Sequence, residues 1–273
     1  MNLSTLWRRA IRRLSRALLP DSRKKVVQAH INGYSLLVLA NEDVGRAIYF
    51  TRDYESPETE YLRKVITSNS VCIDIGANVG YFAMLMASIA HRGKVFAFEP
   101  IPLNAALLRA NAELNGLENI ELIESAVGDH DGEVNLSQST DSAYSSLRDT
   151  ERKAVKQVIR IPITTLDTFV DDRSILSVDV LKIDVEGAEG LVLDGSQALL
   201  SDAARRPRVV LMEVLERNLV PYETRAAAII DMMQSFNYTP YFISDAATLS
   251  PFREDLLEKF ENVLFLTDGQ KRE

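Results

Sequence analysis

The chain has 273 residues, a formal net charge of −8 at neutral pH and 46% hydrophobic residues, which is enough to bury one large core. Its one cysteine, Cys72, excludes an intrachain disulfide framework, and its three histidines are too scattered to indicate a metal cluster. No apolar run is long enough to cross a membrane, and the acidic balance of the body disfavours nucleic acid as a partner.

The first 25 residues differ from the rest in charge, with eight Lys or Arg against one acid. On a helical wheel, the apolar side chains of residues 3–18, Trp7 among them, fall on one face and the arginines fall on the other. Such a basic amphipathic helix, expected within residues 1–25, is typical of contact with an anionic membrane surface. Docking on the protein's own core or on a partner is an equal alternative, and a mitochondrial transit peptide stays open.

Residues 26–69 are expected to form a β-rich cap ahead of the main domain of residues 70–273. Asn32-Gly33 lies between two alternating runs, which predicts a tight hairpin. The expected elements of the cap are strands over residues 26–31, 34–39 and 46–50 and a helix over residues 54–67. Three side chains of this helix could face a cofactor pocket, although exposure to solvent is the simpler expectation: Tyr54, Glu58 and Glu60.

The chain is organised around residues 71–75, an apolar run interrupted only by Asp74, which predicts a strand buried on both faces. Two glycines, Gly76 and Gly80, follow it and flank Asn78. Glycine tolerates the backbone angles of a tight turn and leaves room for a ligand to approach the main chain. The helix expected next, over residues 81–90, would direct its free amide groups at whatever lies above the turn.

A second apolar strand, residues 94–98, ends in Glu99-Pro100. An acid at the tip of the neighbouring parallel strand is suited to the two hydroxyls of a ribose, so the candidate ligands are a dinucleotide and S-adenosylmethionine. Asn78 stands where a dinucleotide turn would have its middle glycine. Its side chain would crowd a diphosphate but could donate to a carboxylate, which favours S-adenosylmethionine.

Strand and helix alternate after Glu99, with a helix over residues 103–115 and a strand over residues 119–124. The loop that follows, residues 125–129, is where the base of a nucleoside would lie. An insertion at about residues 130–162 is expected to contain a hairpin of residues 133–136 and 156–161 around a long polar loop. We assign that loop, residues 137–152, to substrate capture, because loops of this length in compact domains are usually functional or mobile.

A second chemical stretch follows the strand predicted over residues 180–183. Lys182 and Asp184 share a face of that strand, and Asp184 stands at its carboxyl end, where ligands bind in open α/β sheets. Glu186 begins the next helix, where stabilisation of the helix dipole is a purely structural alternative. Glu213 ends a further apolar strand, residues 209–212. Two closing strands are expected over residues 238–243 and 262–266, after a helix over residues 224–236.

Six segments together resemble the FkbM family of S-adenosylmethionine-dependent methyltransferases over about residues 70–215. They are Asp74 to Gly80, Phe98-Glu99-Pro100, Ala126 to Asp129, Ser145-Ser146-Leu147, Thr165-Leu166-Asp167 and Lys182 to Glu189. The resemblance implies an α/β fold with the Rossmann-like sheet of class I methyltransferases, mostly parallel with an antiparallel last strand. It also implies S-adenosyl-L-methionine as cofactor and O-methylation of a hydroxyl on a sugar, glycolipid or secondary metabolite.

The resemblance and the residue pattern give the same roles to the candidate site residues. Three groups would bind the cofactor: Asp74, Gly76, Ala77, Asn78 and Gly80 at its methionine end, Glu99 and Pro100 at the ribose, and Ser125, Ala126 and Val127 at the adenine. Asp184 is the expected general base, Glu186 or Glu213 would assist or orient it, and Lys182 could lower the pKa of the acceptor hydroxyl.

No metal is expected, although the three acids Asp184, Glu186 and Glu213 could hold a divalent ion. The expected partner is a small-molecule or glycan acceptor, with membrane contact through residues 3–18 and a cytoplasmic location on or near the inner membrane surface. Two other functions remain at this point: a nicotinamide-dependent oxidoreductase, and a catalytically silent adaptor at the membrane surface. The sequence gives no indication of the oligomeric state.

Overall fold

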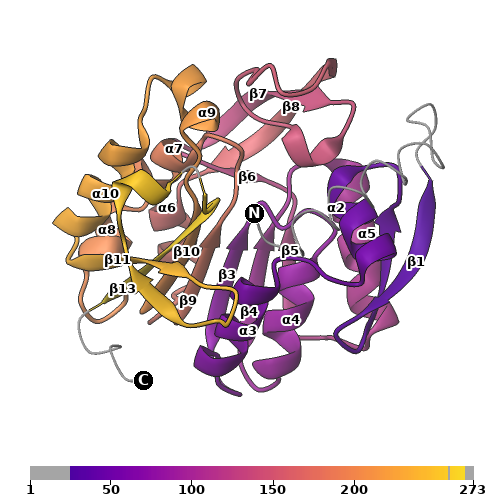
Figure 1. Cartoon of the computed structure of the whole chain (residues 1–273), viewed down its shortest axis with the longest axis horizontal. Helices are drawn as coiled ribbons and strands as arrows, with labels where there is room; N and C mark the ends of the chain where they lie inside the picture. Colours follow the sequence, from indigo (N-terminus) through magenta and orange to yellow (C-terminus); the bar gives the residue numbers. More distant parts are fainter. Residues whose placement is uncertain (1–24, 258, 268–273) are drawn as a thin grey trace.

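The computed structural model describes residues 25–257 and 259–267, and the helix predicted within residues 1–25 therefore lies almost wholly outside the described part. The core of the molecule is an eight-stranded sheet with the order β12-β11-β13-β10-β9-β3-β4-β5 (Figure 1). Its strands are β3 (Val71–Ile75), β4 (Lys94–Phe98), β5 (Ile120–Ile123), β9 (Val180–Ile183), β10 (Val209–Glu213), β11 (Tyr238–Ile243), β12 (Leu249–Pro251) and β13 (Asn262–Thr267).

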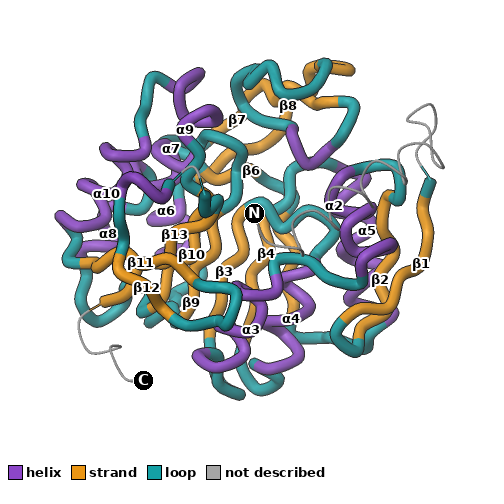
Figure 2. Tube along the Cα trace, viewed as in Figure 1, coloured by secondary structure: helices purple, strands orange, loops and turns teal. Residues whose placement is uncertain are grey.

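The five central strands β10, β9, β3, β4 and β5 run parallel, and β13, the last strand, pairs antiparallel with both β10 and β11. The predicted fold class is therefore confirmed. Because β3 and β9 are neighbours, the two segments that carry the predicted chemistry lie side by side, with Asp74 in register with Lys182. In Figure 2, loops surround the upper ends of the central strands.

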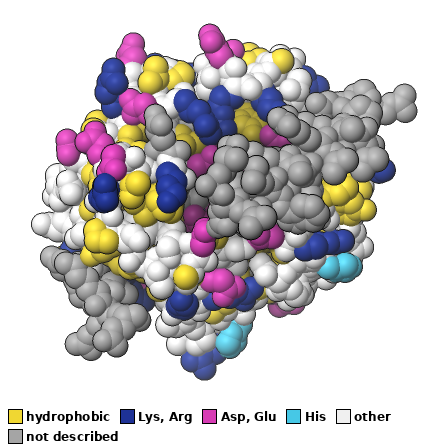
Figure 3. Space-filling view, viewed as in Figure 1, with side chains coloured by type: hydrophobic (Ala, Val, Ile, Leu, Met, Phe, Trp, Pro, Cys, Tyr) yellow, Lys and Arg dark blue, Asp and Glu magenta, His cyan; other side chains and the backbone are white. Residues whose placement is uncertain are grey.

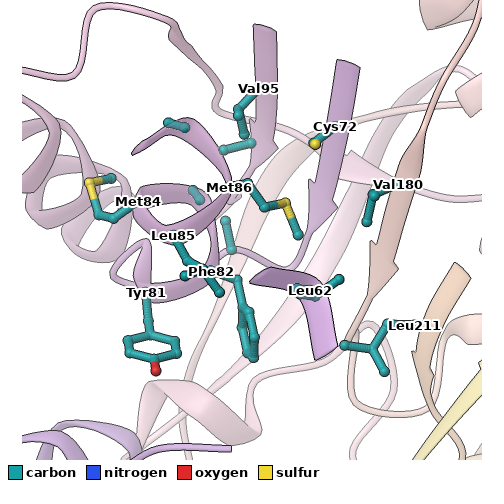
Figure 4. Packing of buried hydrophobic residues seen from close by; sticks show 14 of the residues in the cluster. Leu62, Cys72, Tyr81, Phe82, Met84, Leu85, Met86, Val95, Val180 and Leu211 are labelled. Carbon is teal, nitrogen blue, oxygen red and sulfur yellow. The ribbon is translucent and has the colours of Figure 1, made fainter. Parts of the chain in front are cut away.

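Successive residues of the parallel strands point to opposite faces of the sheet, and each face packs against its own helices. One face lies against α3 (Ser56–Val65), α4 (Tyr81–Ile89) and α5 (Pro102–Leu114). The other lies against α6 (Leu166–Asp172), α7 (Glu189–Asp194), α8 (Gln197–Ser201) and α10 (Ala226–Ser235). Figure 4 shows the first face, where Phe82 and Met86 of α4 lie towards the strands that carry Cys72 and Val180. Cys72 is buried there as a free thiol, as expected.

The N-terminal cap contains the predicted hairpin, β1 (Val26–Ile31) and β2 (Tyr34–Leu39), with Asn32 and Gly33 both at positive φ. The strand predicted over residues 46–50 is wrong. The chain forms α2 (Asp43–Arg46) and then a π-helical turn, Ala47–Thr51.

The close approach of α2 to β2 explains this helical structure. A Cβ at Gly45 would lie 2.1 Å from the backbone oxygen of Leu39, so the chain turns back directly on β2. The apolar residues Val44, Ala47 and Ile48 then recur at helical rather than alternating spacing, and Ile48 is fully buried.

The insertion forms a separate three-stranded sheet. The two predicted strands lie within longer ones, β7 (Gly132–Ser139) and β8 (Val155–Thr164), which pair antiparallel. A short strand, β6 (Ala126–Val127), pairs with β8 and was expected to be a loop. The division of the chain into three domains at about residues 25 and 69 stays a prediction, because the cap and the main domain share one hydrophobic cluster.

Candidate active site

A pocket of about 1220 Å³ lies at the carboxyl ends of β3, β4, β9 and β10. All of the candidate site residues line it except Gly80. Gly80 instead precedes α4 with φ +90°, where a Cβ would lie 2.8 Å from Cγ of Leu108, so its place in the structure is that of a tight helix start. Tyr54 and Glu58 of the cap also line the pocket, whereas Glu60 is exposed.

The turn after β3 is held against both neighbouring strands. Gly76 has φ +82°, and a Cβ there would lie 1.8 Å from the backbone oxygen of Asp184. On the other side, the amides of Gly76 and Ala77 both donate to the carbonyl of Phe98, at 3.0 and 2.9 Å. Asn78, also at positive φ, accepts the amide of Val79 through Oδ1 at 2.8 Å. The turn is therefore packed directly on the backbone that carries Asp184.

We expect Gly76→Ala to destabilise the protein by about 3 kcal/mol or more, because it combines left-handed strain with a backbone clash. Gly116→Ala is the matched control, since Gly116 also has positive φ, +64°, but nothing lies within 4 Å of its Cβ position. Strain alone makes that change cost about 1 kcal/mol. Urea unfolding of both variants measures the difference, and equal losses would contradict the packing described for Gly76.

Asp74 is 1% exposed, and neither of its carboxylate oxygens has a hydrogen-bond partner among the described residues. Burial raises the pKa of Asp74 to about 6, against the opposing effects of the Lys182 charge and the nearby Ala83 amide. Although the Ala83 amide and the Lys182 charge lie near, both carboxylate oxygens keep lone pairs that no hydrogen bond uses, which favours a ligand that brings a cationic donor.

Glu99 joins the turn after β3 to the segment after β4. Its two oxygens accept the backbone amides of Asn78, at 2.8 Å, and Ile101, at 2.9 Å. Burial raises the pKa of Glu99 to about 7, although these two amides oppose the shift. Oε1 also accepts from the side-chain amide of Asn104 at 3.5 Å, whereas Oε2 keeps a second lone pair that can accept a hydrogen bond from a ribose beside Pro100.

The base-binding loop is shaped by the insertion. Ala126 and Val127 form β6 and pair with Ile163 and Thr164 of β8, while Ser125 donates its hydroxyl to the carbonyl of Ala126 at 2.9 Å. All three predicted adenine residues line the pocket.

Lys182 and Asp184 form an ion pair in which Nζ and Oδ2 are 2.9 Å apart. The ammonium group also lies 4.9 Å from the ring centre of Phe82. Burial alone would lower the pKa of Lys182, but the charges of Asp184, Asp74 and Glu55 outweigh it and raise that pKa above its usual value. Lys182 therefore stays protonated and cannot itself serve as a base.

The three predicted acids lie together beside Lys182, and Asp184 belongs both to this group and to the ion pair. Asp184, Glu186 and Glu213 each offer a carboxylate oxygen, and these oxygens all lie within 4.8 Å of one another. Burial, and then the neighbouring acids, raise the pKa of Glu186 and of Glu213 well above their usual values. Acidic and basic side chains lie close together near the centre of the face shown in Figure 3.

Sequence patterns did not reveal two further residues of this cluster. Arg152 of the insertion forms an ion pair with Glu186, and Asn218 of α9 (Glu216–Leu219) donates to both Glu186 and Glu213. Arg152 is the last residue of the polar loop that was assigned to substrate capture, but nothing in the adjacent sequence indicates its ion pair with Glu186. Asn218 lies five residues beyond Glu213, and no motif marks it.

The largely buried acids whose pKa values are raised set the pH dependence of stability, and Asp141, raised to about 6, is among them. The pKa is raised to about 6 at Asp74, about 7 at Glu99 and Glu189, and about 8 at Glu55, in each case mainly by burial. At pH values between the ordinary carboxyl pKa and these raised pKa values, the native state therefore binds more protons than the unfolded state.

We therefore expect the ligand-free protein to lose stability as the pH rises from about 5 to 8. Thermal unfolding across this range measures the trend, and Glu189→Gln should make it shallower. A melting temperature that rises with pH would contradict the buried, raised acids.

The fold and the pocket define a methyltransferase of class I architecture. Residues 74–240 match the family model described as "Methyltransferase FkbM domain", and the chain belongs to this family of S-adenosylmethionine-dependent methyltransferases. Family membership favours methyl transfer over the two other functions left open by the sequence, the nicotinamide-dependent oxidoreductase and the silent adaptor.

Curated relatives include the 2-O-methyltransferase NoeI of Sinorhizobium fredii, 26% identical over 63% of this chain and 74% of its own length. Methyltransferase 1 of Beauveria bassiana is 25% identical over 46% of this chain and 58% of its own length. The 31-O-demethyl-FK506 methyltransferase FkbM of Streptomyces tacrolimicus is 29% identical over 58% and 71%. Among solved structures, a SAM-dependent methyltransferase from Agrobacterium tumefaciens aligns with a TM-score of 0.47 and 9% identity, over 89% of this chain and 70% of that one.

The residues present fit S-adenosylmethionine. The carboxylate of Asp74, whose oxygens make no hydrogen bond among the described residues, suits the ammonium group of its methionine end. No helix within the described residues is both long and apolar enough to cross a membrane.

Proposed function

We propose that this protein transfers the methyl group of S-adenosylmethionine to a hydroxyl of a sugar, glycolipid or secondary metabolite. The observation that carries the proposal is the cluster of Asp184, Glu186 and Glu213 in the same pocket as the unpartnered Asp74. Carboxylates can accept the proton that a hydroxyl releases on methylation. The names of two relatives, a 2-O-methyltransferase and a 31-O-demethyl-FK506 methyltransferase, agree with an oxygen acceptor.

In this proposal, S-adenosylmethionine supplies an electrophilic methyl group, and the protein supplies position and a base. Asp74, Gly76, Ala77 and Asn78 hold the methionine end, Glu99 and Pro100 the ribose, and Ser125, Ala126 and Val127 the adenine. Holding the two reactants in line can supply about 7 to 11 kcal/mol of the acceleration in favourable cases.

Asp184 is the proposed general base, because it lies at the strand end and is held by Lys182 at 2.9 Å. The ion pair fixes the orientation of the carboxylate, and Oδ1 remains to accept the proton of the acceptor hydroxyl. The positive charge of Lys182 also stabilises the negative charge that develops on the acceptor oxygen as its proton leaves. Glu186 and Glu213 are proposed to bind neighbouring hydroxyls of the acceptor.

We propose a mechanism without a metal ion. Each of the three acids already has one oxygen engaged by a protein donor: Asp184 by Lys182, Glu186 by Arg152 and Asn218, and Glu213 by Asn218. These donors partly neutralise the carboxylates, which leaves less negative charge to hold a divalent ion. Chelation with EDTA should therefore leave turnover unchanged, and restoration of lost turnover by magnesium would overturn this part.

The pocket has room for an acceptor beside the cofactor, because about 1220 Å³ exceeds the 300 to 1,000 Å³ that is typical of single-ligand sites. Tyr54, Tyr144 and Phe260 line it and offer rings on which a sugar or another flat apolar surface can stack.

The test begins with calorimetry of S-adenosylmethionine on the full chain. Cofactor with a ¹³C-labelled methyl group is then incubated with a panel of saccharides, glycolipids and hydroxylated metabolites, and with amine analogues of each. The proposal predicts a new methyl ether resonance with at least one hydroxyl acceptor. Absence of cofactor binding, or methyl transfer only to the amines, would overturn it.

We also propose peripheral contact of residues 3–18 with an anionic membrane on the cytoplasmic side, as their charge pattern indicates. Sedimentation of the full chain with anionic vesicles, but not with neutral ones, is the expected result. Replacing five arginines with serine should abolish it: Arg8, Arg9, Arg12, Arg13 and Arg16. Equal recovery with both vesicle types would contradict the proposal.

A further inference from the structure

Asn218 is fixed in place by its backbone before its side chain makes any contact. It is 1% exposed, and its amide donates to the carbonyl of Leu215 at 2.8 Å at the start of α9. Its own carbonyl faces Gly187, where a Cβ would lie only 2.1 Å away. Since Gly187 directly follows Glu186, the main chain of Asn218 and that of the acidic loop are in direct contact.

The side chain of Asn218 joins two acids, Glu213 at the end of β10 and Glu186 in the turn after β9. Its Nδ2 group donates to Oε2 of Glu213 at 2.8 Å and to Oε2 of Glu186 at 3.0 Å. Its Oδ1 accepts from the guanidinium of Arg152 at 3.1 Å. An amide has two N–H donors, and both are used here, while the Arg152 donor fixes which end of the amide points to the acids.

The carboxylate oxygens of Glu186 and Glu213 lie within 4.8 Å of each other. Two largely buried carboxylates this close repel each other and would move apart without a shared donor. Arg152 offsets part of the charge, because it also pairs with Glu186, but within the described residues it forms no ion pair or hydrogen bond with Glu213. The neutral amide of Asn218 is therefore the group that contacts both acids and keeps them adjacent.

We propose that Asn218 is a positioning residue, which holds the carboxylates of Glu186 and Glu213 side by side at the acceptor end of the pocket. Through Arg152 it also ties their placement to the insertion. The inference rests on the proposed function, because it assigns the two acids to acceptor binding, and it adds the residue that sets their geometry.

The link to the insertion runs through stacked and hydrogen-bonded groups. The guanidinium of Arg152 lies 4.2 Å from the ring centre of Tyr144, whose hydroxyl donates to Oδ2 of Asp43 at 2.8 Å. Asp43 belongs to α2 of the cap. The cap, the insertion and the two acids thus form one continuous set of contacts around the pocket.

Removing Asn218 changes the titration of the two acids in a defined direction. Hydrogen bonds to a carboxylate favour its charged form, so their loss raises the pKa of Glu186 and Glu213. The other charged groups that act on both acids are Asp184 and Glu189, which raise the two pKa values, and Arg152, which lowers them; Glu261 raises the pKa of Glu186. None of these four is altered in the variants below.

The first experiment needs no acceptor. Side-chain carboxyl carbons of ¹³C-labelled glutamate are titrated by NMR in the wild type, Asn218→Ala and the isosteric Asn218→Asp. We expect the Glu186 and Glu213 resonances to titrate at higher pH in both variants, most in Asn218→Asp, which adds a further charge. In the wild type, the Asn218 side-chain amide protons should follow the same titration, a result that does not depend on any variant folding. The proposal would be overturned if the Glu186 and Glu213 carboxyl carbons titrated at the same pH in all three proteins. It would also be overturned if the Asn218 amide proton shifts did not change over the titration.

The second experiment separates positioning from stability. With an acceptor identified, Asn218→Ala should lower kcat by about 100-fold, as expected for misplaced polar groups, with cofactor affinity within about twofold of the wild type. The control is Asn119→Ala, which removes an amide that donates only to the carbonyls of Ala87 and Ala90. It should lower the melting temperature and leave kcat unchanged.

A wild type that binds cofactor but methylates no hydroxyl would contradict the proposed function while leaving the titration result intact. A wild type that methylates normally, with Asn218→Ala as active as the control, would contradict the positioning role alone.

Discussion

Asp184→Asn is expected to lower kcat by about 10²- to 10⁴-fold, the usual contribution of a general base, while cofactor affinity stays within a few-fold. Asparagine keeps the size of the side chain but cannot take up the acceptor proton, and it leaves the buried Lys182 without its ion-pair partner at 2.9 Å. Single-turnover kinetics under saturating cofactor and acceptor measure the chemical step directly.

The control for this variant comes from the other end of the same strand. Asp179 precedes β9 at the amino edge of the sheet, where it accepts the amide of Val71 at 2.8 Å and pairs with Arg208. Asp179→Asn should weaken the fold without slowing the chemical step. Turnover of Asp184→Asn within a few-fold of the parent, with cofactor affinity preserved, would show that another group is the base.

Asp74→Asn is expected to have opposite effects on cofactor binding and on stability. Loss of a buried charge that faces a cationic group costs about 2 to 5 kcal/mol of binding, or roughly 30-fold to several thousand-fold in Kd. The same change should stabilise the ligand-free protein by up to about 3 kcal/mol above pH 6, because burial raises the pKa of Asp74 from 3.8 to about 6.

The sign follows from the raised pKa: the native state disfavours the charged carboxylate, so its cost is present above pH 6 and disappears below the unfolded value. Calorimetry and thermal unfolding of the same preparations measure both effects. Weaker binding together with a lower melting temperature would indicate that Asp74 is a structural anchor and not a cofactor ligand.

The strands around the site could be predicted because they are buried on both faces. The segments over residues 71–75, 94–98 and 180–183 are apolar except for one charged residue each, and the structure has strands at those bounds. In a parallel sheet the polar residues at the strand ends must meet at one edge. The sequence therefore predicts that Asp74, Glu99 and Asp184 lie near one edge of the sheet.

The remaining features depend on contacts that are distant in sequence. Arg152 reaches Glu186 across 34 residues and Asn218 across 66, and no local periodicity records such pairs. The strand expected over residues 46–50 was wrong for the same reason, since its helical form follows from the approach of Gly45 to Leu39. The helical spacing of Val44, Ala47 and Ile48 extends beyond the five residues from which the strand was predicted.

The pairing of β6 with β8 has a consequence for engineering. Ala126 and Val127 belong to the same small sheet as the hairpin that carries the acceptor loop. A chimera that takes this hairpin from a relative, built to change which alcohol is methylated, would therefore also displace the loop proposed to hold the adenine ring. Such grafts should alter the Michaelis constant for S-adenosylmethionine, whereas point substitutions at the tip of the loop of residues 137–152 should not.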